Sequence, residues 1–239
     1  MCRGYYAGRE LTLSVSTVNI LDFFFPKRCV GCGKIGKYFC IFCTAKIRYI
    51  QANEYICPMC GRLALDGATH PGCRTRYGLD GLTSFFHYDG PVRKAVKALK
   101  YRRISDLASE FVFLIPTKLL SSNLLSSLFI PIPLHTSRFR LRGFNQAEVL
   151  GKLLAARLNI PVRTGILKRV KITQPQVDMK NRDERLKNMK NVFRAVQTIQ
   201  NKDILLFDDV FTTGATMRST ANVLKRAGAK RVWAVTIAR

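Results

Sequence analysis

Residues 204–216 read ILLFDDVFTTGAT, and this stretch decides how the rest of the chain is interpreted. Its apolar run predicts a strand buried inside a parallel sheet. Two adjacent carboxylates, Asp208 and Asp209, follow, and a turn of small hydroxylated residues then opens a helix. The backbone N–H groups of such a turn suit a phosphate, whereas the carboxylates would repel it and are expected to face sugar hydroxyls or Mg²⁺. The stretch therefore predicts a site for a phosphorylated sugar.

The alternation of strand and helix continues on both sides of this stretch. Strands are predicted at 82–88, 128–132, 203–207 and 231–237, and helices at 92–101, 107–120, 147–158 and 217–227. Pro116 should bend or end the second helix. Helices between short apolar strands imply crossover connections, so we expect an α/β fold with a parallel sheet flanked by helices. Ligands of such sheets bind beyond the carboxyl ends of the strands.

Cysteines dominate the region before the sheet. Two thiolates separated by two residues can face one tetrahedral ion, and glycine after the pair lets the backbone turn around it. Three such pairs occur, with a fourth in which histidine replaces one cysteine, and the eight expected metal ligands are Cys29, Cys32, Cys40, Cys43, Cys57, Cys60, His70 and Cys73. Four half-sites predict two structural Zn²⁺ ions. Sequential pairing assigns the first four ligands to one ion, but the spacing is equally compatible with a cross-braced pairing.

Composition limits the class of protein. A chain of 239 residues that is 47% hydrophobic can form a core, but it is too short for two full enzyme domains. The net charge of +25 predicts attraction to polyanions such as nucleic acid or phosphorylated metabolites. No secretory signal and no transmembrane segment is found, so we expect a cytoplasmic protein with reduced thiols rather than disulfides.

Several motifs together resemble the ComF family, whose members are associated with DNA uptake in natural transformation. Residues 204–216 are similar to the phosphoribosyl-pyrophosphate (PRPP) fingerprint of type I phosphoribosyltransferases. The order of the cysteine pairs, 88–93, 99–101, 131–135, 138–147, 173–176 and 182–188 also looks like that family, from about Ile20 to the end. One departure is His70, since the family usually has cysteine there. The resemblance implies an N-terminal tail (1–19), a double zinc-ribbon domain (20–78) and a phosphoribosyltransferase-like domain (79–239).

The same resemblance assigns roles to residues of the fingerprint. Asp208 and Asp209, the expected catalytic residues, would contact the ribose hydroxyls, with Mg²⁺ accompanying PRPP. The 5′-phosphate loop would consist of Thr212, Thr213, Gly214, Ala215 and Thr216.

Basic and amide side chains are expected to hold pyrophosphate. Guanidinium groups suit phosphate oxygens, and those of Arg138, Arg140 and Arg142 are predicted on a loop, with Asn145 and Gln146 as neutral donors. The basic, polar stretch between 167 and 192, including Arg169, Lys171, Thr173 and Gln174, resembles the flexible loop that closes over the active site of phosphoribosyltransferases, and the resemblance implies a lid there. Residues 138–194 carry 15 Lys and Arg against 4 Asp and Glu, a net +11 beside the expected site. His135 is expected to pack or hydrogen-bond rather than act as an acid or base.

Two functions of different classes follow. In the first, the protein is a Mg²⁺-dependent enzyme that transfers 5-phosphoribosyl from PRPP to a nitrogen nucleophile. In the second, it is a non-enzymatic module that binds single-stranded DNA or a DNA-translocation helicase, with a ligand-sensing or vestigial PRPP site. With only two residues after the last strand, any hood for an acceptor base is expected from the zinc module. Its aromatic residues, Tyr38, Phe39, Phe42 and Tyr55, fit base stacking and core packing equally well.

Overall fold

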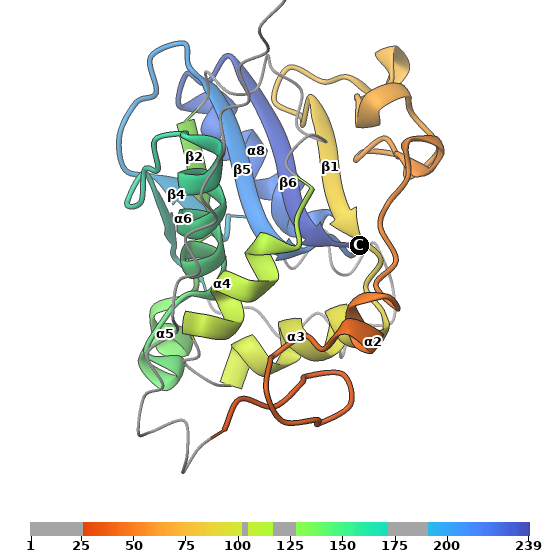
Figure 1. The fold of residues 1–239 in the computed structure, drawn as a ribbon. Helices are drawn as coiled ribbons and strands as arrows, with labels where there is room; N and C mark the ends of the chain where they lie inside the picture. The colour runs from red at the N-terminus through yellow and green to blue at the C-terminus, as the bar shows by residue number, and fades with distance from the viewer. Residues whose placement is uncertain (1–25, 102–104, 117–127, 172–190) are drawn as a thin grey trace, which may run out of the picture.

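A four-stranded parallel sheet forms the centre of the molecule in a computed structural model, which describes residues 26–101, 105–116, 128–171 and 191–239 (Figure 1). The strand order is β1-β6-β5-β2. These strands are β1 (Gly81–Phe86), β2 (Leu128–Pro131), β5 (Asp203–Val210) and β6 (Arg231–Ala238). The middle of β5, residues 204–207, is apolar and fully buried, and most of β6 is buried as well, as expected for central parallel strands.

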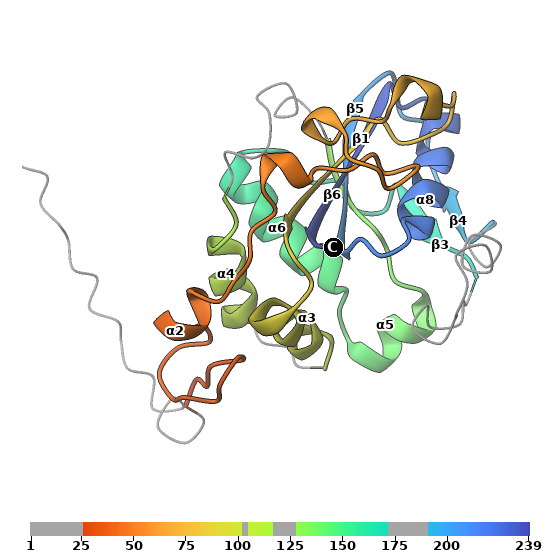
Figure 2. The same ribbon diagram turned by 90° about the vertical axis from the view of Figure 1, so that its right-hand side faces the viewer.

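Helices cover both faces of the sheet (Figures 1 and 2). One face carries α3 (Gly90–Tyr101), α4 (Ser105–Phe113) and α6 (Gln146–Leu158), and the other carries α8 (Ala215–Arg226). Each face has its own apolar core, with Phe85, Phe111 and Phe207 fully buried in the first and Leu206 and Leu224 in the second. The predicted α/β architecture is therefore confirmed.

Both outer strands of this sheet are accompanied by irregular chain. Beside β1, the Ile50 N–H donates to Phe85 O at 2.9 Å and the His87 N–H donates to Arg48 O at 3.0 Å. Beside β2, the Phe129 N–H donates to Pro161 O at 2.9 Å. The segment that covers β1 belongs to the cysteine-rich region, which is thus attached along the sheet.

Most predicted elements are found within a few residues of their expected ends, with differences in the lid region and at the end of the second helix. Two short strands, β3 (Leu167–Arg169) and β4 (Phe193–Ala195), pair antiparallel where the lid was expected. The helix expected at 107–120 ends at Phe113, before Pro116. Most of the lid (172–190) and the whole of the expected N-terminal tail (1–19) lie outside the described residues. In the part of the chain that is described, no helix is long and apolar enough to cross a membrane.

Candidate functional site at the carboxyl edge of the sheet

Strand β5 ends in the two adjacent carboxylates. Asp208 and Asp209 are both partly buried, and successive side chains of a strand point to opposite faces of its sheet. The Asp209 N–H donates to Oδ1 of Asp208 at 2.9 Å, and Oδ2 of Asp209 lies 3.2 Å from the Lys100 ammonium of α3. The aspartate that has a cation partner is thus anchored to the neighbouring helix.

Asp208 carries the most perturbed carboxyl of this edge. Burial and the neighbouring charge of Asp209 raise its pKa to about 8, although Lys100 and Arg169 act in the opposite direction. For Lys100, burial lowers the pKa, but the carboxylate of Asp209 outweighs it and the net shift is upward. A buried carboxyl that costs energy to ionise is typical of a functional site.

The candidate phosphate loop (residues 212–216) joins β5 to α8. Gly214 adopts a left-handed conformation with φ 73°, and a Cβ atom there would lie 2.5 Å from the Phe211 ring. Only glycine fits this position, because both the conformation and the close ring exclude a side chain. The loop ends at the first turn of α8, where backbone N–H groups have no partner within the helix. Thr212 is exposed, and Thr213 and Thr216 are half-buried. The loop is therefore a candidate anion site.

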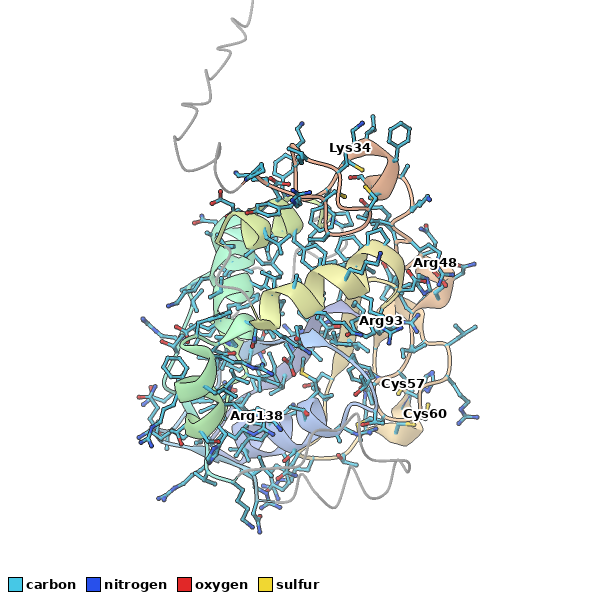
Figure 3. The ribbon with its side chains drawn as sticks, turned by 90° about the horizontal axis from the view of Figure 1, so that it is seen from below. Lys34, Arg48, Cys57, Cys60, Arg93 and Arg138 are labelled. Atoms are coloured by element: carbon cyan, nitrogen blue, oxygen red, sulfur yellow. The ribbon has the colours of Figure 1, made fainter. Side chains whose placement is uncertain are left out.

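The predicted arginines divide into two groups. Arg138, Arg140 and Arg142 lie on a short helix, α5 (Thr136–Arg142), and not on a loop as predicted. Residues four apart share a helix face, so Arg138 and Arg142 lie together, whereas Arg140 projects elsewhere and is exposed. Viewed onto the carboxyl edge, Arg138 and Cys57 lie at opposite sides of the molecule (Figure 3).

The cations next to Asp208 affect one another. Burial, followed by the charge of Arg142, lowers the pKa of Arg138. Burial and the charge of Arg138 lower the pKa of Arg169, while Asp208 raises it. Arg169 of β3 is therefore within electrostatic range of both Arg138 of α5 and Asp208 of β5. Such a cluster of like charges favours a bound anion.

The remaining predicted donors make other contacts. Asn145 caps α6 through Oδ1, which accepts from Ala147 N–H at 3.2 Å, and its Nδ2 donates to Ile132 O at 2.9 Å. Gln146 accepts from Arg142 Nη1 at 3.2 Å. His135 caps α5 by accepting from Ser137 N–H at 3.2 Å, so it hydrogen-bonds as expected. Lys171 is exposed, and Thr173 and Gln174 lie outside the described residues.

The metal ligands form two clusters, with all ligand atoms of a cluster within 4.8 Å of one another. The first cluster contains Cys29, Cys32, Cys40 and Cys43, and the second contains Cys57, Cys60, His70 and Cys73. The pairing is thus sequential rather than cross-braced. In the first, the sulfurs of Cys32 and Cys40 are 3.7 Å apart, which matches the separation of about 3.8 Å between thiolates on one tetrahedral Zn²⁺. Both clusters fit structural zinc.

The hydrogen bonds of His70 leave its Nδ1 available as a metal ligand. Its Nε2 lies 2.8 Å from Leu63 O, and its Nδ1 lies 3.4 Å from the sulfur of Cys60. A carbonyl oxygen can only accept, so Nε2 must carry the proton and Nδ1 keeps its lone pair for the metal. The departure from four cysteines therefore leaves a complete ligand set.

The two clusters dock on different parts of the sheet domain. Around the first, Lys94 Nζ of α3 donates to Gly31 O at 2.6 Å, and the Tyr38 N–H donates to Glu110 of α4 at 3.1 Å. Next to the second, Arg218 of α8 donates to Met59 O at 2.9 Å. The second cluster is therefore the one that contacts the helix of the candidate phosphate loop.

Two residues of this edge were not predicted from the sequence to belong to the site. Lys100 falls inside a motif, but nothing in its own helix indicates its ion pair with β5. Arg218 had no local signal at all, since its partners Pro58 and Met59 are 160 and 159 positions away. Only the folded chain brings such residues to the site.

Two family models match this chain. A double zinc ribbon domain matches residues 20–74, and a phosphoribosyl transferase domain matches residues 145–239. These ranges contain, respectively, all eight ligands of the two clusters and the acidic end of β5 with the candidate phosphate loop.

Similar proteins carry names that refer to DNA. DNA utilization protein YhgH of Salmonella typhimurium is 30% identical over 201 residues, which cover 80% of this chain and 86% of that protein. Competence protein F of Haemophilus influenzae is 28% identical over 227 residues, covering 90% and 98%. Competence protein ComFC of Bacillus subtilis is 28% identical over 205 residues, covering 79% and 78%. With its double zinc ribbon, its phosphoribosyl transferase domain and these relatives, the chain belongs to the ComF family of competence and DNA utilization proteins.

Proposed function

We propose that this protein binds PRPP with Mg²⁺ at the carboxyl edge of the sheet and transfers its 5-phosphoribosyl group to a nitrogen nucleophile during DNA uptake in a cytoplasmic setting. The observation that carries the proposal is the combination of chemical groups at this edge. Two partly buried carboxylates are followed by the candidate phosphate loop, and Arg169 and Asp208 are close enough to affect each other's charge. These three kinds of group suit the ribose, the phosphate and the pyrophosphate of PRPP.

Each part of PRPP has a proposed partner. The 5′-phosphate occupies residues 212–216 at the start of α8, and the ribose hydroxyls bind Asp208 and Asp209. Mg²⁺, when bound with PRPP, neutralises part of the pyrophosphate charge. Arg138, Arg142 and Arg169 receive the pyrophosphate, and Lys171, Thr173 and Gln174 of the predicted lid are further donors. Arg140, which projects from another side of α5, takes no part. Asn145 and Gln146 contribute by holding the start of α6 next to α5.

The transfer exchanges one bond for another. The bond between C1 of the ribose and the pyrophosphate oxygen breaks, and its electron pair leaves with pyrophosphate. The lone pair of the acceptor nitrogen forms the new C–N bond, and the proton lost from that nitrogen passes to pyrophosphate or water. The arginines stabilise the charge that develops on the leaving group.

A thermal-shift experiment tests the binding step. PRPP with Mg²⁺ should raise the unfolding temperature of the full chain, and the shift should vanish in the double variant Asp208→Asn, Asp209→Asn. Asp203→Asn is a matched control, because Asp203 begins the same strand and pairs with Arg231 at the opposite end. A shift that persists in the double variant would refute the pocket. Release of pyrophosphate, assayed with a panel of bases and with and without single-stranded DNA, then tests transfer.

A second candidate function is binding of single-stranded DNA or of a translocation helicase without chemistry. The supporting observation is a surface next to the first cluster, on α2 (Ile41–Thr44), where Ile41 is 79% and Phe42 is 69% exposed. The ammonium of Lys34, which Figure 3 labels, lies 5.9 Å from the centre of the Phe42 ring. Aromatic rings next to cations suit unpaired bases and their phosphates.

The two candidates make different predictions. Binding by this surface should weaken steeply with salt, because neutralised phosphates release counterions. It should also survive the double aspartate substitution. If pyrophosphate release is never detected while salt-dependent strand binding is, the non-enzymatic function is favoured.

A further inference from the structure

One side chain connects the second metal cluster with the candidate phosphate loop. Nη1 of Arg218 donates to Met59 O at 2.9 Å and to Pro58 O at 3.2 Å. Nη2 of the same guanidinium donates to the backbone oxygen of Thr213. Arg218 lies in the first turn of α8, and its own N–H donates to Gly214 O at 2.8 Å. A single planar group therefore spans from the metal knuckle to the loop.

The contact with Thr213 fixes the direction of a proposed phosphate donor. In a trans peptide unit the C=O and the N–H point in opposite directions. When Arg218 holds the carbonyl of Thr213, the N–H of Gly214 must point away from Arg218. The Phe211 ring, 2.5 Å from where a Gly214 Cβ would be, limits other arrangements of this turn. Arg218 thus determines how one loop N–H is presented.

The other end of Arg218 rests on a turn whose shape depends on the metal. Pro58 and Met59 are the two residues between the ligands Cys57 and Cys60. The turn is closed by the Gly61 N–H, which donates to Cys57 O at 2.9 Å, and Met59 packs against the apolar core beneath α8. Without the ion, the four ligands are no longer fixed to one centre, and the two carbonyls lose part of the orientation that Arg218 needs. The donors of a guanidinium lie in one rigid plane. If the carbonyls of Pro58 and Met59 move, the guanidinium reorients, and its hydrogen bond with Thr213 changes as well.

The first cluster has no such connection among the described residues. Its recorded contacts outside the cysteine-rich region run to α3 and α4, through Lys94 and Glu110. The first cluster therefore serves as an internal control, because it binds the same kind of ion without a contact to the candidate phosphate loop.

We propose that Arg218 is a positioning residue through which the metal-bound second cluster shapes the phosphate loop, so that the affinity for PRPP depends on metal in the second cluster and not in the first. This inference rests on the proposed function.

Calorimetric titration of the full chain with PRPP and Mg²⁺ tests the role of Arg218. Arg218→Met should weaken binding about tenfold or more, because a hydrogen-bonded charged group is lost. Arg226→Met is the matched control on the same helix, since Arg226 contacts Asn222 and the Tyr77 ring instead. Arg218→Lys keeps the charge but has only one nitrogen, so it should not restore affinity. Full restoration by lysine would show a simple charge effect and overturn the proposal.

The metal arm of the test compares the two clusters. His70→Ala removes a ligand from the second cluster and should weaken PRPP binding, whereas Cys32→Ala removes one from the first and should not. His70→Cys retains four ligands and should bind PRPP like the wild type. In the Arg218→Met background, His70→Ala should cause no further loss, because both changes break the same connection. Losses that add, or equal losses from His70→Ala and Cys32→Ala, would overturn the proposal.

Two controls separate the possible failures. Circular dichroism and zinc content show whether each variant is folded and how many ions it has lost. If a ligand variant does not fold, graded removal of zinc by a chelator should weaken PRPP binding by the wild type and leave binding by Arg218→Met unchanged. If the wild type itself does not bind PRPP, the proposed function fails. If the wild type binds and Arg218→Met binds equally well, only the positioning role is refuted.

Discussion

The ammonium nitrogen of Lys100 lies 3.2 Å from Oδ2 of Asp209, so the last turn of α3 is tied to the end of β5. The exposed fractions of the two side chains are 30% and 15%. An ion pair that is largely shielded from water contributes more than one on the surface, and removal of one partner leaves the other without compensation.

Lys100→Met should therefore lower the free energy of unfolding by about 1–3 kcal/mol, since Asp209 would lose its cation while staying partly buried. Chemical denaturation at pH 7 measures this change. The control is Lys97→Met, an exposed lysine of the same helix, for which a change within about 0.5 kcal/mol is expected. Equal effects of the two substitutions would contradict the importance of the pair.

Asp208 should make stability depend on pH. Burial and Asp209 raise its pKa from 3.8 to about 8, with Lys100 and Arg169 opposing. Between these values the native state holds a proton that the unfolded chain releases, so stability should fall as pH rises from about 4 to about 8.

Asp208→Asn should flatten this dependence and raise the free energy of unfolding at pH 8, because the amide has no charge to bury. Denaturation at pH 5, 6.5 and 8 measures the slope. The control Asp203→Asn should change stability in the opposite direction, because a hydrogen bond from Arg231 lowers the pKa of Asp203 and the charged form is the stabilising one. This variant should be less stable than the wild type at all three pH values. If the unfolding free energy depends on pH with the same slope in the wild type and in Asp208→Asn, the raised pKa of Asp208 is contradicted.

Metal content should follow the sequential pairing of the clusters. Elemental analysis of the wild type should give about two zinc ions per chain, because each four-ligand cluster fits one ion. Cys32→Ala should reduce the content to about one, and His70→Cys should leave it unchanged. A content near zero in the wild type would remove the basis for both zinc sites.

Two aromatic residues of the first cluster region should behave differently. Phe39 is 6% exposed, and its ring stacks on Phe111 with centroids 5.4 Å apart, whereas Phe42 is 69% exposed. Phe39→Ala should cost about 3–5 kcal/mol of unfolding free energy. Phe42→Ala should change it by less than about 0.5 kcal/mol while weakening the binding of single-stranded DNA. Unchanged strand binding by Phe42→Ala would argue against this surface.

Much of the fold was predictable because its signals are local. A buried apolar strand, two carboxylates and a glycine turn lie within thirteen consecutive residues at 204–216, and the ligand pairs of each cluster span four residues each. The sequence predicts that Gly214 is part of a turn. It does not predict the close approach of Gly214 to Phe211, because that depends on the side-chain conformation of Phe211.

Other features depend on contacts that no local pattern records. Arg138, Arg140 and Arg142 alternate with apolar residues and were predicted on a loop, but His135 and Gly143 cap a short helix there. The strands β3 and β4 have three residues each, too few for a visible periodicity. Lys100 joins the site through Asp209, far away in the chain, and the contacts of Arg218 with Pro58 and Met59 are equally distant in sequence.

The segment beside β1 has a consequence for any attempt to study the sheet domain alone. Arg48 and Ile50 occupy hydrogen-bonding positions along the outer side of β1, and Thr69 donates to Asp80 O just before that strand. A chain shortened to begin at residue 79 would lack all three and would present a bare row of amide groups, which invites pairing with a second molecule. Such a fragment should self-associate and precipitate. By covering the outer edge of β1, the cysteine-rich region should also prevent aggregation through this edge, in addition to any part it has in binding.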